Sequence, residues 1–394
     1  MSEIEFELER DEPIELGLTR EELAQAVLFT TDWTVETVLS QLSKGHIGLN
    51  PAFQRRDAWR IDKKSRFIES LLLGLPVPQI VLAEDKTKKG QYLVLDGKQR
   101  LLTLLQFSGQ APSSTWNKFK LSGLSYLPAL EGHSIDTLTQ NPKFEEDSRA
   151  FSNYPIRSSI IRHWPNSRYL ETVFVRLNEG SLKLSAQELR QAMSTGPFAT
   201  YLDAFVSDSV PMRTLLKNDG PDFRMRDTEL MLRLLAFAMF PSDYTGDMKA
   251  FLDGTMNRLN TEWIQLGREA EAALSDINQA IQFGHDVLPK EFARKFDVKQ
   301  NTYSNYLNRA VAEIQIYYFR NPKVRSWVTS NTQEFLSLFA NLTRENPEFL
   351  QSLEATTKSL TAVGTRFQLF GDALRVAVDE GIQPMHLENN RLVS

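Results

Sequence analysis

The hydrophobic pattern of this chain changes character about halfway along its length. From about residue 32 to residue 176, short apolar runs of strand type alternate with short amphipathic segments. After residue 185, long segments place apolar residues at i, i+3 and i+4, and strand signals become rare. A chain of 394 residues is also too long for one ordinary hydrophobic core. The pattern therefore predicts an α+β fold, in which a mixed α/β domain precedes a mainly α-helical bundle domain.

The periodicities assign individual elements in both halves. The first half is expected to contain helices at 34–44, 61–75 and 98–107, and strands at 79–85, 91–95 and 158–164. The second half is expected to contain helices at 185–194, 226–240, 262–281, 303–319, 333–343 and 366–380. The aromatic run IYYF at 316–319 is expected in the helical core.

The composition excludes several classes of protein. The chain has no cysteine, which excludes disulfides, thiolate nucleophiles, zinc fingers and iron–sulfur clusters. Its five histidines form no i, i+4 pair, so we assign no metal ligand from the sequence. No apolar run approaches the roughly 20 residues that span a membrane, and the acidic N-terminus lacks the order of a secretory signal. We expect a cytoplasmic protein without membrane contact.

Charge is distributed unevenly along the chain. Residues 1–30 hold nine acidic and two basic side chains, a balance of −7, so the rest of the chain carries +2 of the total of −5. Residues 3–9 read EIEFELE, which favours a short strand with one acidic face, although a frayed tail and an acidic flap that competes with an anion are alternatives. We divide the chain into an acidic arm (1–31), a first domain (32–184) and a helical domain (185–394).

One motif places five polar or special residues between a strand and a helix. It reads YLVLDGKQRLLTLL at 92–105. Asp96 is a good helix N-cap, and Gly97 permits a backbone conformation or close approach that a side chain would block. The free N–H groups of the next turn favour an anion. Arg100 could grip phosphate oxygens with two N–H groups, whereas Lys98 acts as a point charge. The motif fits a phosphate cradle, and equally a capped helix whose arginine covers the sheet edge.

Two further segments carry polar groups of the same kind. The string NPAFQRRDAW, from residue 50, sets Gln54, Arg55 and Arg56 among apolar anchors, and it opens a basic stretch with six cations and two carboxylates over residues 53–66. The string VFVRLNEGSLKLSAQELRQA, from residue 173, carries Arg176 and Asn178.

The second of these strings also predicts a helix start. Ser185 is expected as the N-cap and Glu188 as the third helical residue, which together make a capping box. Gln187 and Arg190 could face outward on that helix.

Five strings in series resemble a known family. They are PAFQRRDAW, FIESLLLGLPVPQIVL, VLDGKQRLLTL, VFVRLNEGSLKLSAQELRQA and FRMRDTELMLRLLAF, and together they span about residues 33–260. They are similar to the domain-of-unknown-function 262 (DUF262) family, the N-terminal domain of GmrSD-type modification-dependent restriction enzymes, which is related to the ParB and sulfiredoxin fold. The resemblance implies a ParB-like domain that binds and can hydrolyse nucleoside triphosphates with Mg²⁺, usually in bacterial defence against phage or foreign DNA. Sulfiredoxin chemistry is excluded, because its cysteine has no counterpart.

The resemblance also implies roles for individual residues. The family signature Asp-Gly-Gln-Gln-Arg maps onto residues 96–100, with Lys98 as the departure that puts hydrolysis in question. Asp96 would order the turn or position magnesium or water. We expect catalytic roles for Asp96, Gln99 and Arg100, and nucleotide binding by Gln54, Arg55, Arg56, Gly97, Lys98, Arg176 and Asn178.

Restriction enzymes of this class commonly add a His-Asn-His nuclease domain. The nearest string, GHDVLPKEF at 284–292, has His285 before an aspartate, and no second histidine follows at a useful distance. No Walker phosphate-binding string occurs either. We therefore expect a sensor or regulator that lacks its own nuclease of this type.

Two other functions stay open. In one, the chain is a DNA-binding module whose basic stretch, including Arg60, Lys63 and Lys64, contacts phosphates. In the other, the first domain is itself a nuclease that uses Asp57, Asp62 and Asp96. The expected partners are a nucleoside triphosphate, DNA or a DNA-acting protein, and a second copy of the chain through the helical half.

Overall fold

A computed structural model describes residues 19–49, 59–110, 118–177, 185–194, 196–222 and 224–393. The chain divides into two compact units, one within Pro13–Met193 and the other at Ser194–Ser394. The helix α9 (Ala186–Met193), which we had predicted to open the second domain, falls in the first unit.

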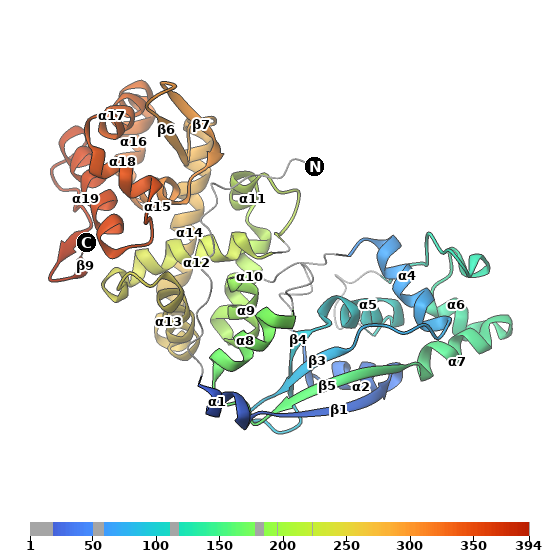
Figure 1. Cartoon of the computed structure of the whole chain (residues 1–394). Helices are drawn as coiled ribbons and strands as arrows, with labels where there is room; N and C mark the ends of the chain where they lie inside the picture. Colours follow the sequence, from blue (N-terminus) through green and yellow to red (C-terminus); the bar gives the residue numbers. More distant parts are fainter. Residues whose placement is uncertain are drawn as a thin grey trace. The chain divides into compact units, whose positions relative to one another are not determined.

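The first unit is built on a mixed five-stranded sheet in the order β1-β5-β3-β4-β2. Figure 1 labels β1, β5, β3 and β4 of this sheet. The edge strand β1 (Val27–Thr34) is antiparallel to β5 (Pro155–Arg162). The central strand β3 (Ile80–Glu84) runs parallel to β5 and antiparallel to β4 (Tyr92–Asp96). The short β2 (Ile47–Gly48) is parallel to β4.

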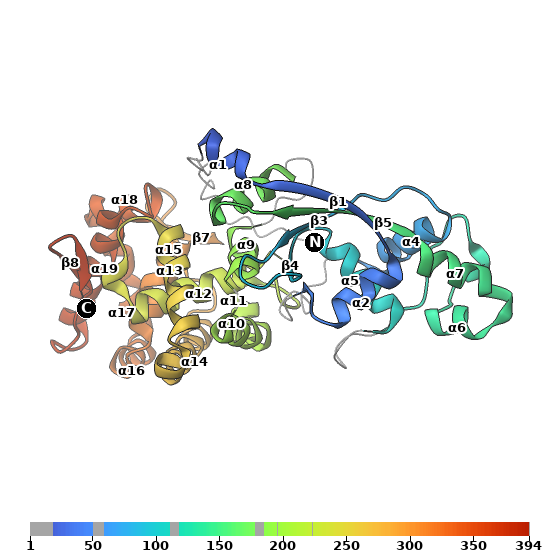
Figure 2. The same ribbon diagram turned by 90° about the horizontal axis from the view of Figure 1, so that it is seen from below.

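Helices bury apolar side chains against one face of this sheet. Thr34 begins α2 (Val35–Ser43), because its side chain accepts the N–H of Thr37 at 3.1 Å. Apolar side chains of α2, α4 (Ile61–Leu72) and α5 (Lys98–Ser108) share one core with Leu82 and the inner face of β5. The helices α6 (Ile135–Gln140) and α7 (Glu145–Asn153) lie with α4 beyond one end of the sheet in both views (Figures 1 and 2).

The opposite face of the sheet packs against α8 (Ser167–Leu177). Leu170 and Phe174 of this helix join a small core with Val81, Ala83 and other strand residues. Side chains alternate between the two faces along a strand, so Val81 and Ala83 face α8 while Leu82 faces α5. Both faces of the central strands are therefore covered.

The N-terminal part of the first unit differs from the sequence-based expectation. Residues that we assigned to the acidic arm form α1 (Arg20–Gln25) and most of β1. The first half of β1 is exposed at the sheet edge, so it lacks the apolar and polar alternation of a half-buried strand. The strand expected at 3–9 lies outside the described residues.

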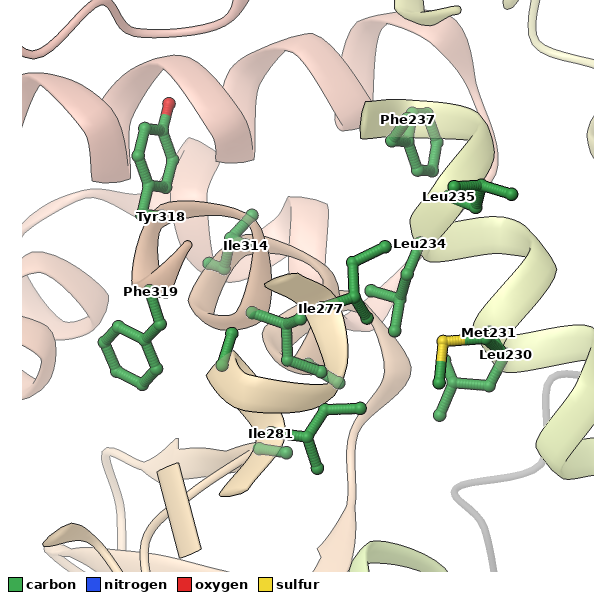
Figure 3. Packing of buried hydrophobic residues seen from close by; sticks show 14 of the residues in the cluster. Leu230, Met231, Leu234, Leu235, Phe237, Ile277, Ile281, Ile314, Tyr318 and Phe319 are labelled. Atoms are coloured by element: carbon green, nitrogen blue, oxygen red, sulfur yellow. The ribbon is translucent and has the colours of Figure 1, made fainter. Parts of the chain in front are cut away.

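The second unit is a helical bundle, as the periodicity predicted. Side chains of α12 (Arg226–Met239), α14 (Trp263–Val287) and α15 (Arg309–Phe319) interdigitate at its centre (Figure 3). Tyr318 and Phe319 are buried there, as expected for the aromatic run. No helix in the described ranges is long and apolar enough to cross a membrane. The remaining helices are α10 (Pro197–Asp208), α11 (Val210–Leu216), α13 (Met248–Thr261), α16 (Pro322–Ser330), α17 (Thr332–Glu345), α18 (Pro347–Glu354) and α19 (Leu360–Ala377).

The single helix predicted at 303–319 is wrong in its first third. Residues Thr302–Leu307 form β7, which pairs with β6 (Arg294–Asp297), and α15 begins afterwards. Asn308 separates the two elements, because its side chain accepts the N–H of Val311 at 3.0 Å and caps the helix. A second hairpin, β8 (His386–Glu388) with β9 (Arg391–Val393), was not predicted.

A buried ionic network joins three helices of the second unit. Glu313 on α15 pairs with Arg233 on α12 and, at 2.5 Å, with Arg366 on α19. The side chains of all three residues are buried. Arg366 also donates to the carbonyl oxygen of Thr357 at 2.7 Å. The carboxylate therefore lies between two guanidinium groups in the core.

Candidate nucleotide-binding turn

A single residue, Gly97, connects β4 to α5. Its φ is +98°, and an added Cβ would lie 2.6 Å from the Cγ2 atom of Ile80 on β3. Both the left-handed backbone and the contact with β3 therefore require glycine. Gly97 is also the N-cap of α5, which corrects the prediction that Asp96 holds this position. Asp96 is still the last residue of β4, and its carboxylate binds Arg100 instead.

The N-cap of α5 is a glycine, so it has no side chain to cap the helix. The first bond of the helix runs from the N–H of Leu101 to the carbonyl oxygen of Gly97 at 2.9 Å. The helix dipole places partial positive charge at this end. The start of α5 is thus able to attract an anion.

Arg100 is fixed in the first turn of α5. Its Nη2 atom donates to the Oδ2 atom of Asp96 at 2.6 Å and to the carbonyl oxygen of Gln79 at 2.9 Å. The side chain is 14% exposed, and its Nε atom is buried without a hydrogen-bond partner among the described residues. Arg100 therefore holds the turn together and also retains a donor that no described residue uses.

Gln99 carries a second unsatisfied polar atom. Within the described part of the chain, its buried Oε1 atom has no hydrogen-bond donor, while its backbone oxygen accepts from the hydroxyl of Thr103 at 2.7 Å. Most buried polar atoms in proteins are paired, with protein groups, water or a ligand. The two adjacent residues Gln99 and Arg100 thus present an unused acceptor and an unused donor.

Two residues of this site were missed from the sequence. Gln79 lies just before β3, and besides binding Arg100 it accepts a bond at its Oε1 atom from the hydroxyl of Ser159 at 2.9 Å. Ser159 on β5 pairs with Val81, which in turn pairs with Asp96. The contacts follow from the strand order, for which the local sequence gives no signal.

The other residues expected to bind nucleotide are placed only in part. Gln54, Arg55, Arg56 and Asn178 lie outside the described residues. Arg176 is exposed in the last turn of α8, and the described contacts do not join it to the turn at Gly97.

The capping box at the start of α9 is confirmed. The N–H of Ser185 donates to Glu188 Oε2 at 2.8 Å, and the N–H of Glu188 donates to Ser185 Oγ at 3.1 Å. The outward orientation considered for Gln187 and Arg190 is wrong, since both side chains are buried. Arg190 donates to the Oε1 atom of Gln187, whose Nε2 atom is buried without a partner. The reason is that α9 packs against β4 and contributes Met193 to the small core.

The basic residues of α4 differ in their exposure. Arg60 is the N-cap and is exposed, and Lys63 is exposed with its Nζ atom 4.7 Å from the centre of the Trp59 ring. Lys64 is 7% exposed and lies 5.9 Å from the ring of Phe119. Arg60 and Lys63 can thus reach a ligand in solvent, whereas most of Lys64 is covered.

The carboxylates considered for a nuclease are not gathered in the described part of the chain. Asp62 pairs with Arg66 on α4 at 3.0 Å, Asp96 pairs with Arg100, and Asp57 lies outside the described residues. In the described ranges, no group of three or more histidine, aspartate or glutamate residues could hold a metal ion. Asp96 retains partial exposure, so it could supply one oxygen to a Mg²⁺ ion that a phosphate also binds.

His285 lies near the end of α14, beside the ring of Phe292. Its Nε2 atom is buried without a partner. Burial lowers the pKa of His285, and the neighbouring Arg294 acts in the same direction while Asp286 opposes it. The neutral imidazole is therefore favoured at neutral pH.

Comparison with known proteins agrees with this architecture. No curated protein matches the chain. Residues 35–194 match the family model described as GmrSD restriction endonuclease, N-terminal domain. This range begins at α2 and ends just after α9, so it contains β4, the turn at Gly97 and α5. The family resemblance indicated by the sequence motifs is thus confirmed over residues 35–194.

Proposed function

We propose that this protein binds and hydrolyses a nucleoside triphosphate as a regulator in a bacterial DNA restriction or anti-phage defence system. The family of residues 35–194 supports the defence role. One observation supports nucleotide binding most directly: α5 starts at a glycine, which has no side chain to cap the helix, beside an arginine whose buried Nε donor has no acceptor among the described residues. A phosphate oxygen would satisfy both kinds of donor.

In this proposal the protein positions the arginine before the ligand binds. Asp96 and Gln79 hold the guanidinium group of Arg100 at 2.6 and 2.9 Å, so little side-chain entropy is lost when phosphate binds. Lys98 adds a positive charge next to the same turn. The family motifs supply further ligands for the phosphates, which we propose to be Gln54, Arg55, Arg56, Arg176 and Asn178.

Hydrolysis would depend on electrostatic stabilisation at the transferred phosphoryl group. Mg²⁺ bound to the nucleotide would neutralise phosphate charge, and Asp96 would orient it or the attacking water. The unpaired Oε1 atom of Gln99 is an acceptor that could hold that water. Arg100 would stabilise negative charge on the phosphoryl oxygens.

The test is isothermal calorimetry with ATP, GTP, CTP and their diphosphates, each with Mg²⁺. Arg100→Ala is expected to abolish binding of the nucleotide that the wild type prefers, because it removes the guanidinium from the cradle. Arg149→Ala is the matched control, since Arg149 also lies four residues after a carboxylate but on an exposed face of α7. An affinity that Arg100→Ala leaves unchanged would exclude the cradle, and far-UV circular dichroism of both variants separates this result from unfolding.

The DNA-binding alternative has its own supporting observation. Arg60, Lys63 and Arg66 are exposed along α4. This function predicts DNA affinity that falls steeply with salt and needs no nucleotide. Incubation of DNA with Mg²⁺, with and without each triphosphate, distinguishes the regulator, the DNA-binding module and the nuclease.

A further inference from the structure

Side chains hold every backbone N–H of the loop at residues 122–127. The N–H of Ser122 donates to Ser65 Oγ on α4 at 2.9 Å. The next two N–H groups donate to the carboxylate of Glu131 at 2.8 and 3.1 Å. The last three donate to the carboxylate of Glu69 on α4 at 3.2, 2.6 and 2.9 Å. The backbone of this loop is therefore fixed along its whole length.

Glu69 restricts the conformation that this loop can adopt. Its side chain is 3% exposed, and burial alone would raise its pKa. The three N–H donors outweigh burial, so the pKa of Glu69 lies below its ordinary value and the buried group remains a carboxylate. A buried carboxylate that binds three successive N–H groups permits few other loop conformations.

The fixed loop presents one aromatic side chain to solvent. Leu124 and Leu127 pack against the core of the first unit, but Tyr126, which lies between them, is 73% exposed. Tyrosine normally buries much of its ring. The loop thus uses two of its large side chains for anchoring and leaves the third free for a contact.

The loop that carries this tyrosine is held against α4, a helix with exposed cations. The N–H of Tyr126 binds Glu69 at 2.6 Å, and Arg66 precedes Glu69 by one helical turn, so Arg66 and Glu69 are neighbours on the helix surface. Lys63 precedes Arg66 by another turn. Arg66 pairs with Asp62 at 3.0 Å, but both side chains are more than half exposed, so the pair is weak and can exchange for a phosphate.

We propose that Tyr126 and the exposed cations of α4, Lys63 and Arg66, form a binding surface for single-stranded nucleic acid. The ring of Tyr126 stacks on an unpaired base, and the cations contact the flanking phosphates. Single strands expose base faces to aromatic side chains, whereas a duplex hides them within the base stack. An exposed ring on a loop that is fixed to a helix with exposed cations therefore fits a single strand better than a duplex. This surface does not require a nucleotide at the turn of Gly97.

The test is fluorescence anisotropy of the full chain with a fluorescein-labelled 20-nucleotide strand and with the duplex of the same sequence, at several salt concentrations. Tyr126→Ala is expected to weaken binding of the single strand about 5- to 100-fold, as for other stacked bases. Tyr126→Phe is expected to retain most of the affinity. Lys63→Ala is expected to lower the slope of log affinity against log salt by about 0.7.

Matched controls make the result decisive. Tyr306→Ala removes another exposed tyrosine, on β7, and is expected to change nothing. Arg100→Ala is expected to retain strand binding, which separates this surface from the nucleotide site. Absence of strand binding, tighter binding of the duplex, or equal losses in Tyr126→Ala and Tyr306→Ala would each overturn the proposal. Thermal unfolding of each variant shows whether a loss reflects the fold.

Discussion

Gly97 determines the geometry of the candidate site at the scale of a single residue. Alanine at this position would have to adopt φ near +98° and would place its Cβ 2.6 Å from Ile80. We expect Gly97→Ala to lower the free energy of unfolding by about 2–4 kcal/mol, through backbone strain and overpacking together. This loss of stability is measured by urea denaturation of the first unit, with unfolding monitored by tryptophan fluorescence.

Gly90 provides the control for that prediction. It has a φ of +80° in the turn between β3 and β4, but an added Cβ would meet nothing within 4 Å. Gly90→Ala therefore reports backbone strain alone, about 1–2 kcal/mol. Equal losses in the two variants would show that the contact with Ile80 relaxes at no cost.

At the scale of elements, Glu69 joins α4 to the loop at residues 122–127. Glu69→Gln keeps one acceptor but turns an amide N–H₂ toward the backbone donors. We expect it to lower the free energy of unfolding by about 1–3 kcal/mol. Because the loop carries Tyr126, this variant is also expected to weaken binding of single-stranded nucleic acid, even though it keeps the aromatic ring of Tyr126.

The same variant changes the pH dependence of stability. The pKa of Glu69 is lower in the folded chain than its ordinary value, so its contribution is complete above about pH 5 and is lost as pH falls through the folded pKa. Glu69→Gln should therefore flatten the loss of stability in acid. Urea titrations at several pH values test this, with Glu145→Gln on the exposed face of α7 as the control. Parallel curves for wild type and Glu69→Gln would contradict it.

The elements differ in how far the sequence determines them. The turn at Gly97 was predictable, because the change from strand to helix pattern and the glycine between them are local signals. The bond of Arg100 to Gln79 and the bond of Ser159 to Gln79 were not, since the order of β5, β3 and β4 brings these residues together. The same reason applies to α9, whose buried Gln187 looks like a surface residue in the sequence but packs against β4.

At the scale of the whole molecule, both compact units carry buried polar groups. In the first unit, unpaired atoms of Gln99 and Arg100 lie at the candidate site. In the second unit, Glu313 joins Arg233 and Arg366 at the centre of the helical core. The first arrangement leaves groups that a ligand can satisfy, whereas the second binds three helices through charges that water does not reach. This difference supports our proposal that the ligand binds in the first unit.

The ionic network makes a last prediction about the second unit. Glu313→Gln removes the charge that pairs with the buried guanidinium groups of Arg233 and Arg366, which is expected to lower the free energy of unfolding by about 3–5 kcal/mol. The control is Glu354→Gln, because Glu354 pairs with Lys295 at 2.9 Å but is 45% exposed, so its loss should cost about 1 kcal/mol or less. Hydrogen exchange measured on peptides from α12, α15 and α19 reports the stability of the second unit separately from that of the first. If Glu313→Gln accelerates their exchange no more than Glu354→Gln does, the network does not hold the three helices together.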